Sequence, residues 1–266
     1  MFKNLFSCLL LNTYIFANFE MTNTNCFLIK ENNRIILQEG DCQSRHSPCS
    51  TFKIAISLMG YNENILQNER YPDWPFQEGY AAGIDIWKQP HYPALWIKNS
   101  CVWYSQIIIQ RIGIKKFQDY ITKFDYGNKD ISADKDKVNG FNSWLSSTLQ
   151  ISANEQIIFL QRLVENKLPA CKKSHEMTKN ILFVENLANG LKLYGKTGAG
   201  YIINKDGFPN KDSQIGWFVG WIEKDNRNII FAHYAEDKEK QDWQIGKKAR
   251  KAVKEKLIHL FNSKTI

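Results

Sequence analysis

The sequence lacks the clustered side chains of a metal centre. It contains no C-x-x-C motif, and its five histidines are isolated along the chain: His46, His91, His175, His233 and His259. Zinc sites in proteins are usually built from closely spaced cysteine and histidine ligands. We therefore expect no metal ion in this protein.

Arginine-rich arms and recognised nucleic-acid-binding motifs are also absent. The formal net charge is +8, but the lysines are spread along the chain and mixed with acidic residues. Proteins that bind nucleic acid usually gather their positive charge on one face or along one helix. We therefore expect no nucleic-acid partner, and only a mild preference for anionic small molecules.

Long hydrophobic runs are missing except at the beginning of the chain. Residues 1–17 contain one lysine followed by an apolar run too short for a comfortable membrane span, and they end at Ala17. This pattern is typical of a secretory signal peptide. We expect cleavage near Ala17, with the exact site open, and a mature, soluble, exported chain over residues 18–266.

The cysteines do not determine one disulfide pattern. The sequence has six, and loss of Cys8 with the signal peptide leaves five: Cys26, Cys42, Cys49, Cys101 and Cys171. An odd number cannot pair completely within one chain, and an oxidising compartment permits disulfides without requiring them. Two competing pairs are plausible from sequence proximity, Cys42 with Cys49 and Cys26 with Cys42.

The composition is that of a protein with a substantial core. Of the 266 residues, 43% are hydrophobic and 13% are aromatic, and eight are tryptophan. A chain of this length and composition buries one large core or two interleaved ones. The remaining question is how the elements are ordered.

Strand patterns lie at both ends of the chain and helical patterns in the middle. Residues 26–37 predict a β-hairpin that turns near Asn32 and Asn33, and residues 50–185 are mainly helical. Helices are predicted at 100–113, at 115–124 and after a capping box that begins at Ser152. Later segments predict strands at 191–195, 214–222 and 228–235, followed by a basic amphipathic helix at 245–261.

These patterns predict an α+β fold. Strands from both chain ends would form one antiparallel sheet flanked by helices, and a helical subdomain at about residues 55–185 would be inserted into it. A cleft between the two parts is the natural place for a site.

One stretch suggests nucleophilic catalysis. Ser50 lies three residues before Lys53, and an apolar helical pattern follows directly. Residues at i and i+3 lie on the same face of a helix, so the lysine amine would reach the serine hydroxyl. The same spacing recurs at Ser132 and Lys135, but in a highly charged segment that we interpret as a solvated surface loop. No G-x-S-x-G motif is present, which disfavours an α/β-hydrolase.

Four short motifs occur in a specific order. They are Ser50-Thr-Phe-Lys53, Ser100-Cys-Val102 opening a helix, Tyr126-Gly-Asn128 at a turn, and Lys196-Thr-Gly198 at the end of a strand. Together they resemble the class D β-lactamases (oxacillinases) among the penicillin-recognising serine enzymes. The Lys196-Thr-Gly-Ala-Gly200 form is similar to the K-T-G-A-G subgroup. Further likenesses extend the resemblance over nearly the whole mature chain: Trp144-Leu145, Gly216–Trp221 and Arg250.

The resemblance implies a serine β-lactamase with a Ser50 acyl-enzyme. Lys53 would be N-carboxylated and act as general base in acylation and deacylation, with Trp144 donating a hydrogen bond to the carbamate. Carbon dioxide or bicarbonate would be consumed for this, and no other cofactor is expected. Ser100 and Lys196 would relay a proton to the lactam nitrogen.

The resemblance also implies which residues bind the substrate. Backbone N–H groups of Ser50 and Ala199 would form an oxyanion hole. Lys196 and Arg250 would meet the substrate carboxylate, with Lys247 and Lys248 as alternatives to Arg250. The other expected substrate-binding residues are Val102, Leu145, Thr197, Gly198 and Ala199. Tyr126-Gly127-Asn128 would shape the wall of the cleft rather than do chemistry.

Two readings of this resemblance compete with a periplasmic β-lactamase that confers resistance. A penicillin-sensing domain and a penicillin-binding transpeptidase would both acylate at Ser50 without turnover. The β-lactamase is favoured because the chain contains Trp144 and shows no membrane span after the signal peptide. The sequence leaves the substrate spectrum and the oligomeric state open.

Overall fold

The structure, a computed structural model, describes residues 25–237 and 245–263. The predicted signal peptide at residues 1–17 lies outside these residues. Within the described ranges, none of the helices has the length and apolar character needed to cross a membrane.

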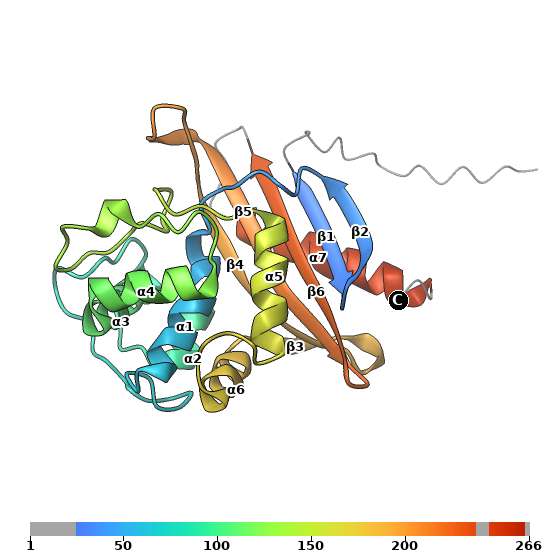
Figure 1. Cartoon of the computed structure of the whole chain (residues 1–266), viewed down its shortest axis with the longest axis horizontal. Coiled ribbons are helices and arrows are strands. Elements are labelled where there is room, and N and C mark those ends of the chain that lie inside the picture. The colour runs from blue at the N-terminus through green and yellow to red at the C-terminus, as the bar shows by residue number, and fades with distance from the viewer. Residues whose placement is uncertain (1–24, 238–244, 264–266) are drawn as a thin grey trace, which may run out of the picture.

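Six antiparallel strands form one sheet in the order β2-β1-β6-β5-β4-β3 (Figure 1). The N-terminal strand β1 pairs with β6, near the other end of the chain. The predicted antiparallel sheet from both chain ends is thereby confirmed. The strand bounds are β1 Cys26–Glu31, β2 Arg34–Gly40, β3 Phe183–Asn186, β4 Lys192–Ile203, β5 Pro209–Lys224 and β6 Arg227–Asp237.

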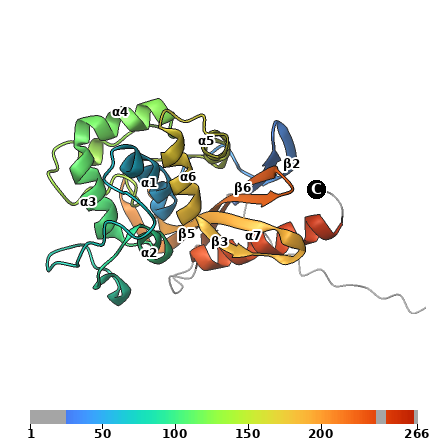
Figure 2. The same ribbon diagram turned by 90° about the horizontal axis from the view of Figure 1, so that it is seen from below.

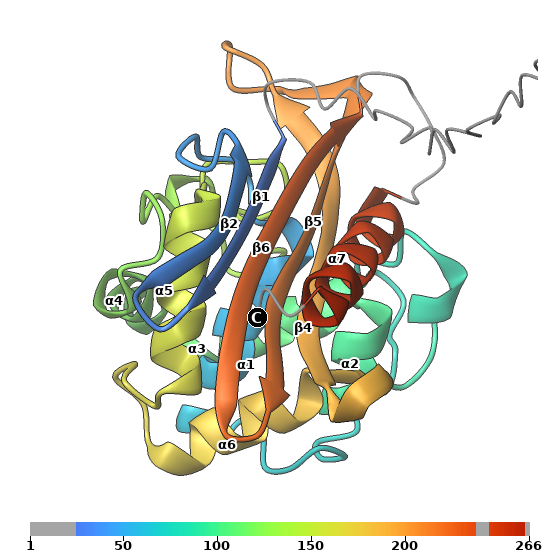
Figure 3. The ribbon, with the colours of Figure 1, turned by 90° about the vertical axis from the view of Figure 1, so that its right-hand side faces the viewer.

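Helices cover both faces of the sheet. One helix, α7, lies across one face, and the other helices lie beyond the opposite face (Figure 3). In the view from below, α1 to α4 and α6 gather at one end of the molecule, away from β2 (Figure 2). The helix bounds are α1 Lys53–Asn62, α2 Pro93–Asn99, α3 Val102–Ile112, α4 Ile114–Phe124, α5 Ala153–Val164, α6 Lys172–Ile181 and α7 Ile245–Asn262.

The strands carry apolar residues on both faces because both faces are covered. Successive side chains of a strand point to opposite faces of a sheet. On β6, Phe231 belongs to the core that Val253 and Leu257 of α7 complete. Its neighbours Ile230 and Ala232 belong to the larger core shared with the other helices. The sheet therefore separates two hydrophobic clusters.

Local sequence signals account for several element boundaries. The predicted hairpin turn is confirmed, since β1 ends at Glu31 and β2 begins at Arg34. The capping box is also confirmed, because Ser152 Oγ accepts a hydrogen bond from the Glu155 N–H at 3.2 Å. Gly113 ends α3 with φ of 82°, a conformation that glycine adopts without strain.

Two sequence predictions were wrong in detail, and one strand was missed. Lys196-Thr-Gly198 lies inside β4 rather than at the end of a strand. Ser100 does not open a helix but occupies the turn between α2 and α3, with φ of 54°. The short edge strand β3 was not predicted, because its four residues are too few to show an alternating pattern.

The disulfide alternatives are resolved in favour of Cys26 with Cys42. The β1–β2 register places Cys26 opposite Gly40, so the chain leaving β2 brings Cys42 back beside Cys26. The competing pair of Cys42 with Cys49 is wrong, since Cys49 is a buried free thiol.

Candidate active site

The predicted nucleophile and base lie where a short 3-10 helix, Cys49–Phe52, continues into α1. Lys53 Nζ donates a hydrogen bond to Ser50 Oγ at 3.1 Å. The one-turn spacing therefore brings the two side chains together as the sequence suggested. The second S-x-x-K copy differs, because Ser132 and Lys135 are exposed.

Lys53 is fully buried, which changes its chemistry. Its side chain is 0% exposed. Burial disfavours the charged ammonium and lowers the pKa of Lys53 to about 8. A substantial fraction of the amine is therefore neutral at slightly basic pH, which is the form that accepts a proton.

A second serine–lysine pair lies beside the first. Lys196 Nζ donates hydrogen bonds to Ser100 Oγ and, at 3.0 Å, to the Thr197 carbonyl oxygen. Burial lowers the pKa of Lys196 well below its ordinary value, and the nearby charge of Lys53 lowers it further. The left-handed backbone of Ser100 turns its hydroxyl out of the helix path toward β4.

The edge of β4 is open beside the nucleophile. The edge strand β3 pairs with β4 only between Lys192 and Tyr194. Beyond this pairing, β4 approaches the 3-10 helix that carries Ser50. A Cβ on Gly198 would lie 2.9 Å from the Pro48 carbonyl oxygen, so only glycine fits this close approach. This geometry suits the predicted oxyanion hole, formed by backbone N–H groups of the two segments.

Trp144 packs against the nucleophile turn. Its ring centroid lies 5.7 Å from that of Phe52. Its carbonyl oxygen accepts hydrogen bonds from the Cys49 N–H at 2.9 Å and from Ser47 Oγ at 2.8 Å. Among the residues that the structure describes, none offers its buried indole Nε1 a hydrogen-bond partner. A buried donor without an acceptor, on a residue that packs against the neighbour of Lys53 in the chain, fits a carbamate on Lys53.

Cys49, Ser146 and Gly200, which were not among the predicted site residues, pack closely together next to the nucleophile. A Cβ on Gly200 would lie 2.4 Å from Cys49 Sγ and 2.6 Å from Ser146 Oγ. Cys49 and Ser146 both have a φ of 49°, in the left-handed region. Burial raises the pKa of the Cys49 thiol to about 11, so it stays protonated. The last glycine of Lys196–Gly200 therefore makes room for two side chains.

The remaining predicted wall residues have mixed surroundings. Val102 is buried at the start of α3, and Leu145 is partly buried. Tyr126 is fully buried, with its ring centroid 5.1 Å from that of Phe52. Asn128 Nδ2 donates to the Thr148 carbonyl oxygen at 2.8 Å, so this turn supports the neighbouring loop.

Arg250 makes an ion pair that the sequence did not indicate. Its Nη2 is 2.5 Å from Glu185 Oε1 on β3, in an ion pair. Gly246 of α7 approaches the K-T-G segment closely, because a Cβ there would lie 3.0 Å from the Gly198 carbonyl oxygen. The structure thus joins Arg250 to the edge strand, and its role at a substrate carboxylate stays a prediction.

Residues 25–237 and 245–263 contain no group of three or more histidine, cysteine, aspartate or glutamate side chains able to hold a metal ion.

Known proteins share this sequence and fold. The family model of the penicillin binding protein transpeptidase domain matches residues 17–259. β-Lactamase OXA-9 of Klebsiella pneumoniae is 38% identical over 252 residues, covering 93% of this chain and 92% of that protein. β-Lactamase OXA-1 of Escherichia coli is 39% identical over 212 residues, covering 77% and 74%.

A solved structure agrees with these relatives. The crystal structure of OXA-427, a class D β-lactamase, has a TM-score of 0.84 and 38% sequence identity, and covers 91% of this chain and 100% of that chain. With its two serine–lysine pairs at the open edge of β4, the chain belongs to the class D β-lactamase family, within the transpeptidase-domain proteins.

Proposed function

We propose that this protein is a serine β-lactamase that opens the β-lactam ring of penicillins through an acyl-enzyme on Ser50. One observation carries the proposal: Ser50–Lys53 and Ser100–Lys196 form two buried serine–lysine pairs beside the free edge of β4. Such a site provides a nucleophile, a base and a proton relay together. Family membership supports the same reaction.

Acylation follows from the first pair and the open strand edge. Ser50 Oγ attacks the lactam carbonyl carbon while Lys53 or its carboxylated form accepts the hydroxyl proton. Backbone N–H groups of Ser50 and Ala199 stabilise the oxyanion. The lactam C–N bond breaks, and the Ser100–Lys196 pair delivers a proton to the departing nitrogen. Lys196 and Thr197 bind the substrate carboxylate.

Deacylation is the step that distinguishes a β-lactamase from a penicillin sensor or a transpeptidase, which acylate without turnover. A carbamate on Lys53 supplies a base that activates the attacking water. Buried Lys53 favours this modification because only a neutral amine reacts with carbon dioxide. Trp144 Nε1–H, for which the described part of the chain provides no acceptor, is suited to donate to the carbamate oxygen. Water then breaks the ester bond, and Ser50 regains its proton.

The pH dependence follows from the lowered pKa of Lys53. Below pH 8 the amine is increasingly protonated and cannot be carboxylated, so turnover is expected to fall as pH falls. At fixed, low carbon dioxide the loss between pH 8 and pH 6 should be about tenfold or more. Hydrolysis rates at constant dissolved carbon dioxide measure this. Added bicarbonate should restore activity at the acidic end, and a flat profile unaffected by bicarbonate would argue against a carbamate.

Intact mass and hydrolysis rate, measured together, test the proposed function. The mature protein is mixed with a penicillin in bicarbonate buffer and followed over minutes. Many turnovers with only a transient adduct of penicillin mass are expected. One stable adduct per chain without turnover would indicate a penicillin sensor or a transpeptidase instead. Absence of both adduct and hydrolysis would exclude all three.

The cellular role follows from the same proposal. A signal peptide at residues 1–17 would export the chain to the periplasm, where hydrolysis of penicillins confers β-lactam resistance. The expected substrates are small β-lactams, and no nucleic acid takes part. Expression in a susceptible bacterium should raise the concentration of penicillin needed to stop growth, and a Ser50→Ala variant should not.

A further inference from the structure

A buried carboxylate lies in the most charged loop of the chain. The segment 128–137 carries alternating acids and lysines, so its side chains were all expected to be solvated. Asp134 is 0% exposed instead. Among the residues that the structure describes, it is the only acidic residue that is completely buried. A carboxylate is withdrawn from water at a large cost unless strong hydrogen bonds replace the lost hydration.

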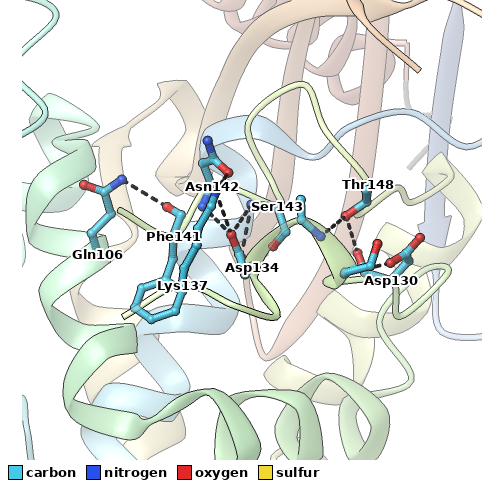
Figure 4. A network of polar contacts seen from close by, with 10 residues as sticks. Gln106, Asp130, Asp134, Lys137, Phe141, Asn142, Ser143 and Thr148 are labelled. Atoms are coloured by element: carbon cyan, nitrogen blue, oxygen red, sulfur yellow. Dashed lines mark hydrogen bonds and ion pairs between the residues drawn. The ribbon is translucent and has the colours of Figure 1, made fainter. Parts of the chain in front are cut away.

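The Asp134 carboxylate binds the backbone directly before Trp144. Its Oδ1 accepts hydrogen bonds from the Asn142 N–H at 2.8 Å and the Ser143 N–H at 3.1 Å, and its Oδ2 also accepts from Ser143 at 3.1 Å (Figure 4). Lys137 Nζ lies 3.5 Å away on the solvent side. Charge-assisted bonds to two successive peptide groups fix the direction in which the chain enters Trp144.

The chain on the other side of Trp144 is held by the nucleophile segment. Ser47 Oγ donates to the Trp144 carbonyl oxygen at 2.8 Å and accepts from the Ser146 N–H at 2.9 Å. The Cys49 N–H donates to the same carbonyl at 2.9 Å. Trp144 is therefore held from two directions, and Asp134 supplies the contacts on the side away from Ser50.

The contacts on both sides of Trp144 determine where its indole N–H lies. Trp144 Nε1 is buried and has no hydrogen-bond partner within residues 25–237 and 245–263, so its position suits a group that binds there. Outer partners that orient a binding group act on affinity even though they never touch the ligand. Loss of the Asp134 contacts would leave the peptide groups of Asn142 and Ser143 unpaired and free the loop to turn.

We propose that Asp134 is a positioning residue for Trp144, and that through Trp144 it sets how readily Lys53 is carboxylated. This inference rests on the proposed function, since it concerns the carbamate of the same site. Asp134 acts on deacylation and on the carbamate equilibrium. The direct Ser50–Lys53 contact remains, and a neutral Lys53 amine can still accept the Ser50 proton, so acylation should fall less than deacylation.

The test is the bicarbonate dependence of turnover in Asp134→Asn, which preserves the side-chain volume. Asp136→Asn is the matched control, because Asp136 is exposed in the same loop and the charge change is identical. Trp144→Phe shows the effect of losing the indole N–H itself. We expect Asp134→Asn to need about tenfold more bicarbonate for half-maximal turnover than the unchanged protein. Trp144→Phe should raise the bicarbonate requirement as well. Asp136→Asn should behave as the unchanged protein.

Two further readouts separate positioning from general destabilisation. The carbamate signal of protein equilibrated with ¹³C-bicarbonate should be reduced in Asp134→Asn and restored by excess bicarbonate. The rate at which the penicillin adduct forms should change less than the rate at which it disappears. If Asp134→Asn does not fold, the test is made with Lys137→Gln, which removes the ion-pair partner of Asp134. A bicarbonate requirement that rises, but by less than the tenfold expected for Asp134→Asn, supports the inference. An unchanged requirement overturns it.

The outcomes distinguish this inference from the proposed function. An unchanged bicarbonate requirement in folded Asp134→Asn, even with a lowered melting temperature, would overturn the positioning role alone. Absence of both a carbamate signal and hydrolysis in the unchanged protein would overturn the proposed function and the inference with it.

Discussion

Lys53→Met is expected to reduce β-lactam turnover by about 10⁴-fold while leaving the fold intact. Methionine fills the space of the buried lysine stem, but it removes the one side chain that, among the described residues, is hydrogen-bonded to Ser50 Oγ. General bases contribute roughly 10²–10⁴-fold to a proton-transfer step. Here one group would serve both acylation and deacylation. The loss should therefore lie at the upper end of that range.

Steady-state hydrolysis and intact mass check this prediction. Lys53→Met should still form an adduct slowly, whereas Ser50→Ala should form none. Lys98→Met is a suitable control because Lys98 is an exposed lysine on α2. Removing a desolvated amine should not lower thermal stability. Turnover within about tenfold of the unchanged protein would show that Lys53 is not the base.

Gly200→Ala is expected to lower turnover by about 10²-fold or more and to destabilise the fold. The new Cβ would lie 2.4 Å from Cys49 Sγ and 2.6 Å from Ser146 Oγ, distances that Cβ atoms do not tolerate. Overpacking of this kind costs about 1–3 kcal/mol. Because Cys49 precedes Ser50, relief of the clash displaces the nucleophile, and a shift of about 1 Å can cost about 10²-fold.

Making room at the neighbouring positions should reverse this effect. In the triple variant Gly200→Ala, Cys49→Gly and Ser146→Gly, both clashing atoms are gone, and glycine suits the positive φ of both sites. Turnover and unfolding in denaturant should recover in part relative to Gly200→Ala alone. Gly83→Ala is the control, since its Cβ would meet only Trp87 at 3.7 Å. Full activity in Gly200→Ala would contradict the conclusion that the close packing of Gly200 with Cys49 and Ser146 positions Ser50.

The order of four short motifs was enough to predict the family. Ser50 and Lys53 are joined by helical spacing, which sequence expresses directly. The antiparallel sheet was also predictable, because Trp217–Ile222 and Ile229–Ala235 have long apolar runs. The K-T-G segment was wrongly assigned to a strand end, since its polar and glycine residues interrupt the apolar pattern of β4.

Other features depend on contacts that local sequence does not express. Asp134 looks solvated in its charged loop, and only the fold brings the Asn142 and Ser143 peptides to it. Cys49, Ser146 and Gly200 meet from three distant segments, so their crowding is invisible in any one of them. Arg250 was placed by resemblance, whereas its ion pair depends on the unpredicted strand β3.

The pairing of β1 with β6 imposes an order on how the site is assembled. Residues Cys26–Glu31 of β1 are made early but find their partner strand only when Arg227–Asp237 exist. Contacts between segments so distant in sequence form late and slowly during folding. The 3-10 helix that carries Ser50 packs against β4. In the sheet, β6 and β5 lie between β1 and β4. A growing chain therefore cannot acquire the active site until nearly all of it has been synthesised.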